Sequence, residues 1–525
     1  MKIIIPSEVK KILARLRKAG FEGYVVGGCV RDILLGREPE DWDITTNAKP
    51  EEIQALFPDS IYENKFGTVA VKVADGLIPT KKLAGTDLMA AGAKNSHRRR
   101  PESKPRKSAF VEVTTFRVEA KYSDKRHPDL VKFANTLTED LARRDFSINA
   151  IALTESENQQ TKNQNHNLQI DNYIIIDPFA GRRDLTNRLI RAVGNPDERF
   201  DEDALRMMRA VRFACQLGFE IEPATFAAIK KNAGWLQAIA KERIRDELIK
   251  IIMSPQAAEG IELLKSAGLL TYILPELEKG VGVTQNRHHI FTVYEHNVLS
   301  LKFAVQKNFN LTVRLAALLH DIAKPLVKAG QGPDATFYNH DFLGAKFAVR
   351  ILERLKFPRQ TIEQVANLIR NHMFVYDIGV VTEAAIRRLL RRVGPENIQD
   401  LVDLRVADRL GSGVPKAQPY RLRHFQYMVE KVQHDPISVK MLKINGNDIM
   451  EILQIEPGPK IGAILDVLLA EVIEEPKRNN KKYLKNRVKE LNELDLSEIR
   501  KLAKQKIEEK KEEEDLEIKG KYWVK

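Results

Sequence analysis

Apolar and polar positions alternate with two different periods along the first 120 residues. Residues 7–19 place apolar side chains three and four positions apart, which predicts a helix with Ser7 as its N-cap. Strands are predicted for FEGYVVGG, DWDIT, GTVAVKVA and FVEVTTFRVEA, with helices over CVRDILLG and KPEEIQALF. This order of elements predicts a small mixed α/β domain.

The pattern becomes helical after residue 185, as in EDALRMMRAVRFACQLGF and ERIRDELIKII, and it stays helical. We therefore expect an α/β head, a mixed sheet with helices, followed by all-α regions. The expected boundaries are 1–185, 186–280, 281–412, 413–475 and 476–525, of which the last is a charged tail forming a solvated helix or a disordered end.

Two segments interrupt the periodic pattern of the head. Residues 81–107 carry nine Lys/Arg and two Asp/Glu, and residues 154–172 are mostly polar. Compact domains rarely contain structureless connections of this length, so we expect two inserted loops.

Charge is concentrated in two segments. The net charge is +13, of which residues 81–107 contribute +7 and residues 477–525 contribute +5. Such clusters favour a polyanionic partner.

Length and composition narrow the class of protein. A chain of 525 residues exceeds what one core serves, so three or four domains are expected. No apolar run reaches the roughly 20 residues of a membrane span, and MKIIIPSEVKK lacks the apolar stretch of a signal peptide. Cys29 and Cys215 indicate neither a disulfide scaffold nor a thiolate zinc site. We expect a cytoplasmic protein without a membrane partner.

The first candidate site lies in the head. Asp41 and Asp43 are two apart on a predicted strand, so their carboxylates share a face. Two such oxygen ligands suit Mg²⁺, which also binds substrate phosphates. Gly27 and Gly28 precede a predicted helix, where backbone N–H groups can meet a triphosphate, and Arg31 adds a cation. Each part alone is more often a turn or a solvated edge; their combination on one strand–helix–strand unit favours nucleotide chemistry.

Five motifs occur in a fixed order: GGCVRDILLG with DWDIT, ARRDFSINAIAL, DPFAGRRDL, DEDALRMMRAVRFA and ERIRDELIKI. Over residues 1–275 they resemble the class II template-independent nucleotidyltransferases, which comprise bacterial CCA-adding enzymes and poly(A) polymerases. The resemblance implies a palm-like head, a helical neck with an RNA-binding region, and metals at Asp41 and Asp43 that serve transfer of a nucleotide to an RNA 3′-hydroxyl. Glu112 is a further candidate carboxylate, and a surface strand residue is at least as good an interpretation.

The second, fourth and fifth motifs suggest how a nucleotide is held. Arg144 and Asp145 fall in the second motif, and Arg144 is a candidate phosphate ligand. Asp203 and Arg206 are three apart on a predicted helix, and together they offer an acceptor and donors to the edge of C or A. Further candidates are Glu202, which would orient the pair, and Arg209, which would reach phosphate. An ordinary helical salt bridge is the alternative for this spacing.

Histidines and aspartates with metal-ligand spacing follow between residues 284 and 412. The order H…HD…D is filled by His296, His320, Asp321 and Asp408. Imidazole and carboxylate together bind divalent metals. The block resembles the HD phosphohydrolase superfamily, in which His340 and His372 resemble the extra ligands of two-metal members. The resemblance implies hydrolysis of 2′,3′-cyclic phosphates or phosphomonoesters, with a divalent metal of unknown identity.

The resulting hypothesis is a tRNA nucleotidyltransferase that completes the 3′-terminal CCA from CTP and ATP, with an HD phosphohydrolase domain over 281–412. The alternatives are a poly(A) polymerase or A-adding enzyme, an RNA-binding HD phosphohydrolase, and a non-catalytic RNA-binding module. Oligomeric state is not predicted. Basic side chains of the insert are candidate contacts to the tRNA backbone: Arg98, Arg99, Arg100, Lys104, Arg106 and Lys107.

Overall fold

A computed structural model describes residues 3–62, 67–73, 109–120, 130–156, 167–170, 172–286, 290–413, 418–433, 442–502 and 518–524. The predicted RNA contacts of the basic insert lie outside these residues. The chain forms two compact units, residues 1–363 and 364–525. None of the described helices is long and apolar enough to cross a membrane.

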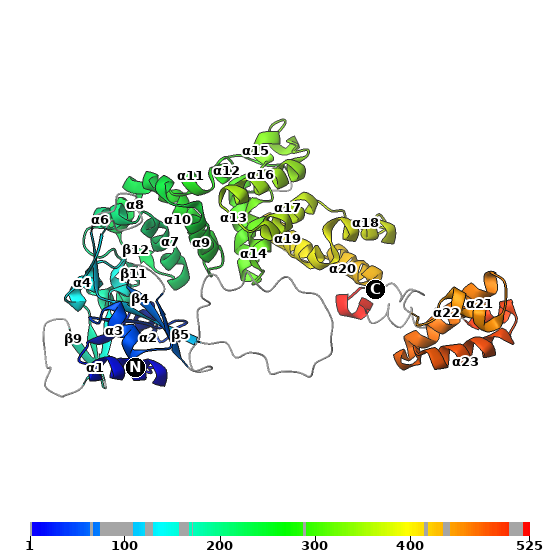
Figure 1. Ribbon diagram of the computed structural model, residues 1–525. Coiled ribbons are helices and arrows are strands. Elements are labelled where there is room, and N and C mark those ends of the chain that lie inside the picture. Colours follow the sequence, from blue (N-terminus) through cyan, green and yellow to red (C-terminus); the bar gives the residue numbers. More distant parts are fainter. Residues whose placement is uncertain are drawn as a thin grey trace. The chain divides into compact units, whose positions relative to one another are not determined.

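The first unit begins with a mixed sheet, which confirms the predicted α/β head (Figure 1). Among the described residues its strand order is β3-β4-β5-β2-β1-β8-β10-β9. These strands are β1 (Gly23–Val26), β2 (Asp43–Thr46), β3 (Ser60–Tyr62), β4 (Thr68–Val73), β5 (Ala109–Thr115), β8 (Ala152–Glu155), β9 (Asn167–Ile170) and β10 (Tyr173–Ile176). Strand β2 runs antiparallel to β1 and parallel to β5, so all three meet at the centre of the sheet. A two-stranded ribbon follows β5, formed by β6 (Arg117–Ala120) and β7 (Leu130–Phe133).

Short helices accompany the sheet. They are α1 (Ser7–Lys18), α2 (Gly28–Leu34), α3 (Pro50–Leu56), α4 (Leu137–Ala142) and α5 (Gly181–Asn187). Ser7 is the first residue of α1 and not its cap, because Pro6 holds the N-cap position. Helix α5 packs so closely on the 3-10 turn Ser147–Asn149 that a Cβ on Gly181 would overlap the Ser147 carbonyl oxygen. Only glycine fits there, which ties the third motif to the second.

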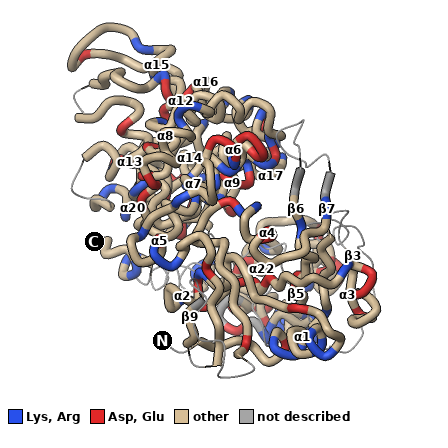
Figure 2. Tube along the Cα trace, turned by 90° about the vertical axis from the view of Figure 1, so that its left-hand side faces the viewer, with Lys and Arg blue, Asp and Glu red and all other residues tan. Residues whose placement is uncertain are grey.

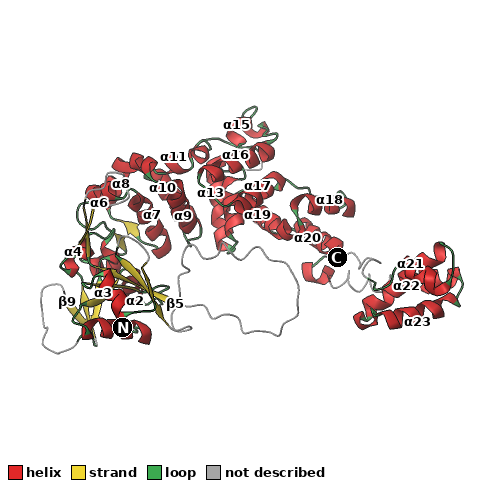
Figure 3. Ribbon diagram, viewed as in Figure 1, coloured by secondary structure: helices red, strands yellow, loops and turns green. Residues whose placement is uncertain are grey.

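The rest of the first unit is helical, as predicted (Figure 3). Two short strands, β11 (Leu189–Ile190) and β12 (Glu220–Ile221), pair in parallel. The helices are α6 (Pro196–Glu202), α7 (Leu205–Leu217), α8 (Pro223–Asn232), α9 (Lys241–Ile252), α10 (Ala257–Ser266), α11 (Leu270–Ile273), α12 (Pro275–Glu278), α13 (Val293–Gln306), α14 (Leu311–Leu319), α15 (Lys324–Val327) and α16 (His340–Arg354).

Helix α17 (Arg359–Asn371) leads into the second unit, which contains α18 (Glu383–Val393), α19 (Ile398–Gly411), α20 (Tyr420–Gln433), α21 (Gly446–Leu453), α22 (Pro459–Glu474) and α23 (Lys481–Asn492). The expected charged tail begins with a packed helix. Leu484, Val488 and Leu491 of α23 are fully buried in one core with α21 and α22. Lys, Arg and Asn make up most of the polar positions of this helix, yet an apolar residue at every third or fourth position is enough to give it a buried face.

Candidate functional site

The centre of the sheet brings carboxylates together in the head. Asp43 opens β2 and is in register with Glu112 on the parallel neighbour β5. Side chains in register on neighbouring strands project from the same face. Glu112 is half-buried and lies beside Asp43, which favours the carboxylate interpretation over a surface strand residue. Asp41 lies in a bend two residues before β2, so the prediction that Asp41 and Asp43 share the face of one strand is wrong. Asp41, Asp43 and Glu112 nevertheless carry the hard oxygen ligands that fit a divalent cation.

Two arginines flank the glycine pair next to Asp43. Gly27 has a φ of +81°, and a Cβ there would lie 2.9 Å from Nη1 of Arg144 and 3.5 Å from Oδ2 of Asp43. A Cβ on Gly28 would lie 3.6 Å from Nη2 of Arg31. Two guanidinium groups and one carboxylate therefore approach bare backbone at β1–α2. This arrangement suits a phosphate chain with its counter-ion.

A hydrogen-bonded chain connects these arginines to the neck. Arg31 donates to Oδ1 of Asn149 at 3.0 Å, and Nδ2 of Asn149 donates to Oδ1 of Asp145 at 3.2 Å. Arg209 on α7 donates through Nε to the other oxygen of Asp145 at 2.8 Å. Burial raises the pKa of Asp145, but the Arg209 guanidinium and these hydrogen bonds outweigh it and hold the pKa below its usual range. Asp145 and Arg209 thus hold Asn149 and Arg31 in place through hydrogen bonds. The sequence analysis did not single out Asn149.

Arg144 has a buried partner that sequence reasoning also missed. Asp140 on α4 is fully buried and forms ion pairs with Arg143 at 2.9 Å and with Arg144 at 3.5 Å. Burial raises the pKa of Asp140, and the two guanidinium groups more than offset this, so the pKa lies below its usual value. The spacing of four residues between Asp140 and Arg144 was the available signal.

The proposed base reader differs from its predicted form. A single helix was expected through Asp203 and Arg206, but α6 ends at Glu202 and Asp203 is extended, with φ −144° and ψ 102°. Its carboxylate accepts from the backbone N–H of Leu205, the first residue of α7, at 3.1 Å. The carboxylate competes with the helical backbone for that N–H, which explains the break. The helical-face argument for the pair is therefore wrong.

Tertiary contacts hold the two side chains instead. Arg243 of α9, in the fifth motif, donates to both oxygens of Asp203, at 3.2 and 2.7 Å. Arg206 is paired with Glu202 at 2.5 Å and also donates to the carbonyl oxygen of Arg143 at 3.1 Å. Acidic positions of α6 appear as red stretches of the tube in Figure 2. Glu202 was expected to orient both Asp203 and Arg206, and it forms an ion pair with Arg206. The contact of Arg243 with Asp203 was not predicted.

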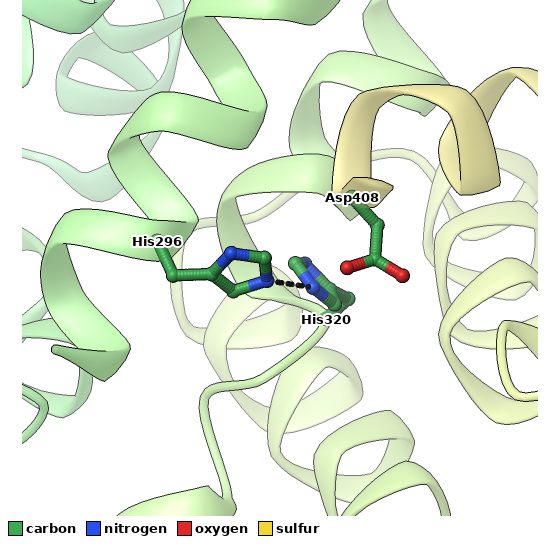
Figure 4. Close-up of side chains that lie close together, drawn as sticks. All are labelled: His296, His320 and Asp408. Atoms are coloured by element: carbon green, nitrogen blue, oxygen red, sulfur yellow. Dashed lines mark hydrogen bonds between the residues drawn. The ribbon is translucent and has the colours of Figure 1, made fainter. Parts of the chain in front are cut away.

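The histidine block also forms a cluster. Nε2 of His296 on α13 lies 3.0 Å from Nε2 of His320 at the end of α14 (Figure 4). Two imidazoles bonded at right angles to one metal, with bonds of about 2.0–2.1 Å, have their nitrogens about 3 Å apart. Two groups of candidate ligand atoms lie within 4.8 Å of one another: His296, His320 and Asp408, and Asp321, His340 and His372. Each predicted metal ligand of the block thus falls in one of the groups.

Backbone carbonyls fix the orientation of three of these rings. Nδ1 of His320 lies 2.9 Å from the carbonyl oxygen of Ala317, and Nδ1 of His340 lies 2.7 Å from that of Phe337. His372 repeats the contact with Ile369 at 2.7 Å. A ring that donates through Nδ1 presents the lone pair of Nε2, which is the form that binds a metal. The donor set fits a divalent cation.

A lysine completes this cluster. Lys324 is buried, lies 2.6 Å from Asp321, and donates to Oε1 of Gln285 at 2.7 Å. Burial raises the pKa of Asp321, but the Lys324 ammonium and the surrounding histidines hold it well below the usual range. Lys324 follows Asp321 by three residues, a spacing that is visible in the sequence but did not by itself suggest a role for the lysine. It places a cation beside the candidate metal ligands.

The fold places the chain in a class: a nucleotidyltransferase head followed by an HD domain. Residues 23–100 and 81–191 match the family model described as Poly A polymerase head domain, and residues 293–413 match the HD domain. Residues 218–280 match "Probable RNA and SrmB- binding site of polymerase A".

Similar proteins identify the family. A CCA-adding enzyme of Lactococcus lactis is 32% identical over 484 residues, 92% of this chain and 97% of that protein. An A-adding tRNA nucleotidyltransferase of Deinococcus radiodurans is 36% identical over 356 residues, 65% of this chain and 76% of that protein. The structure of the Bacillus stearothermophilus CCA-adding enzyme in complex with CTP has a TM-score of 0.54 and 28% identity, covering 93% of this chain and 97% of that one. The chain belongs to the family of tRNA nucleotidyltransferases that includes the CCA-adding enzymes.

Proposed function

We propose that this protein builds or repairs the 3′-terminal CCA of tRNA from CTP and ATP. One observation carries the proposal: Asp43 and Glu112 are in register at the centre of the sheet, next to two glycines flanked by Arg31 and Arg144. The 3′-hydroxyl of the tRNA attacks the α-phosphate of the nucleotide, and pyrophosphate leaves.

The chain's own residues divide this work. Asp41, Asp43 and Glu112 would hold Mg²⁺, which when bound lowers the pKa of the attacking hydroxyl and neutralises charge on the phosphates. Arg31 and Arg144 bind and orient the triphosphate. Asp203 accepts from the exocyclic amino group of C or A, and Arg206 donates to ring acceptors. U and G present a carbonyl at that position and are rejected.

Incubation with defined tRNA ends tests this proposal. A tRNA ending at the discriminator nucleotide should gain two residues with CTP alone and three with CTP and ATP. The variants Asp41→Ala and Asp43→Ala should add none, whereas Asp59→Ala, an exposed aspartate of the same domain, should match the parent. Addition by the double variant Asp41→Ala/Asp43→Ala would refute the assignment.

The same assay separates the alternatives. An A-adding enzyme, like the relative from Deinococcus radiodurans, would extend only a tRNA that already ends in CC. A poly(A) polymerase would build long tails from ATP alone. Either product would replace CCA addition as the function of the head.

A second activity is proposed for the histidine cluster. We infer that it hydrolyses a 2′,3′-cyclic phosphate or a terminal phosphomonoester with a divalent metal. The 3.0 Å separation of Nε2 atoms in His296 and His320 supports this, as do the fixed orientations of His320, His340 and His372. Lys324 would bind the phosphate.

The two activities should separate by mutation. The double variant His320→Ala/Asp321→Ala should lose hydrolysis of 2′,3′-cyclic AMP and keep CCA addition. His424→Ala, which alters a half-buried histidine outside both groups, should keep both. If the parent hydrolyses no 2′,3′-cyclic nucleotide, 2′-nucleotide or phosphomonoester with Mg²⁺, Mn²⁺, Ni²⁺ or Co²⁺, the cluster is structural.

A further inference from the structure

A cavity of about 860 Å³ lies in the first unit, outside both sites described above. Three segments line it: residues from Phe219 to Phe226 of β12 and α8, residues 258–266 of α10, and residues 291–302 around α13. These segments belong to the neck and to the start of the HD domain. None of the lining residues is among the nucleotide-binding or metal-binding residues assigned above.

The walls of this neck cavity are apolar. Phe219, Phe226, Leu263, Phe291 and Leu299 all line it. Phe219 is buried, and the other four are partly buried and contribute to the open surface. Large apolar side chains gathered around one hollow are typical of a binding site.

The rim carries a negative charge. Four lining residues are glutamates, Glu220, Glu259, Glu262 and Glu295, and one is a lysine, Lys302. Lys302 pairs with Glu259 at 3.2 Å, so that pair is close to neutral. Glu262 forms a longer ion pair with Lys265 at 3.9 Å. Among the described residues Glu220 makes no ion pair. Glu295 caps α13 by accepting from Thr292, and these hydrogen bonds lower its pKa, so it stays ionised.

The apolar walls and the acidic rim together indicate the chemistry of the ligand. The family description names RNA and SrmB for residues 218–280. The phosphates of RNA would be repelled by carboxylates at the rim. The acidic rim also contrasts with a chain of net charge +13. A ligand that matches both features has apolar groups for the walls and cations for the rim. In proteins, an amphipathic helix with Lys or Arg beside its apolar face has this chemistry.

We propose that the neck cavity binds a basic amphipathic helix of a partner protein. Apolar side chains at positions i, i+3 or i+4 and i+7 of that helix enter between Phe226, Leu263 and Leu299. Its Lys or Arg side chains meet Glu220, Glu262 and Glu295. The site lies apart from the nucleotidyl-transfer residues, so the enzyme can act while the partner is bound.

The test uses two fluorescein-labelled helical peptides with the same Leu positions, one with Lys and one with Glu at every polar position. Fluorescence anisotropy with the full-length protein should show saturable binding of the Leu/Lys peptide and at least tenfold weaker binding of the Leu/Glu peptide. The variant Glu220→Lys/Glu262→Lys should weaken Leu/Lys binding at least tenfold, and so should Leu263→Asp. Glu451→Lys/Glu493→Lys makes the same charge change at exposed sites of the second unit and should leave binding unchanged.

Three results would overturn the proposal. The first is equal binding of both peptides, which would remove the role of charge. The second is an equal loss with the Glu451→Lys/Glu493→Lys control, which would indicate a general electrostatic effect. The third is displacement of bound peptide by saturating tRNA, which would make the cavity part of the RNA path. CCA addition by each variant should match the parent, because no transferase residue is changed, and thermal unfolding of each variant checks that it is folded at the assay temperature.

Discussion

The contact between Arg243 and Asp203 offers a direct test of how the base is read. Both carboxylate oxygens of Asp203 accept hydrogen bonds from this one guanidinium. Oδ1 of Asp203 also accepts from the backbone N–H of Leu205. In Arg243→Ala the Asp203 carboxylate keeps its hydrogen bond to the backbone N–H of Leu205, so α7 still begins at the same residue. The side chain loses the group that fixes its direction.

The size of the effect follows from the geometry. A hydrogen bond between charged groups contributes about 1.5–3 kcal/mol. The side chains of Arg243 and Asp203 are 28% and 16% exposed, so solvent screening reduces this to about 1.5–2 kcal/mol for the pair. Since about 1.4 kcal/mol corresponds to a factor of ten, the productive orientation of Asp203 should become about 10- to 30-fold rarer.

Steady-state kinetics with each nucleotide would measure this. The kcat/KM for CTP and ATP should fall about 10- to 30-fold in Arg243→Ala, while the slow use of UTP and GTP, which makes no bond to Asp203, should change little. The kcat/KM of Arg243→Lys should lie between those of the parent and the alanine variant. The lysine ammonium retains the positive charge but cannot make the paired hydrogen bonds of a guanidinium. The matched control is Arg245→Ala on the same helix, whose ion pair is with Asp246. Unchanged discrimination among the four nucleotides in Arg243→Ala would refute the reasoning.

Three further predictions concern other parts of the chain. Gly27→Ala should reduce nucleotide addition at least 100-fold, because the added Cβ would lie 2.9 Å from Nη1 of Arg144. Gly20 has a similar positive φ, and its Cβ would meet no atom within 4 Å, so Gly20→Ala should lower only the stability measured by thermal unfolding. Arg209→Ala should destabilise the protein by about 1–3 kcal/mol, because it leaves the buried Asp145 carboxylate without its ionic partner. The stability of this variant should rise from pH 7 to pH 5, because without the Arg209 guanidinium the burial of Asp145 raises its pKa. In the parent the pKa of Asp145 is lowered, so its contribution is complete above about pH 4 and is lost only at lower pH; a variant without a rise towards pH 5 would contradict this. Deletion of residues 81–107 should weaken tRNA binding and flatten the dependence of log K on log salt, leaving the choice between C and A unchanged; an unchanged slope would make the segment a linker.

Local patterns in the sequence were sufficient for the fold class and for much of the site. Strand and helix periodicity predicted the mixed sheet and the long helical remainder, because an element that buries one face must repeat its apolar residues at the period of that element. The motifs around Asp41, Asp43, His320 and Asp321 were visible for a similar reason. Carboxylates and imidazoles that bind the same metal ion often lie close together in the chain.

Only the tertiary structure decided how these groups are held. Glu112 became a credible ligand when the sheet placed β5 beside β2, across a gap of 69 residues from Asp43. The partner of Asp203 comes from a helix 40 residues away, and the break between α6 and α7 reflects a side-chain bond that periodicity does not record. Asn149 and Lys324 stand out only through their polar contacts inside the fold, with Arg31 and Gln285 respectively. Such contacts depend on which surfaces meet, and the spacing of residues along one segment carries no information about the segment that packs against it.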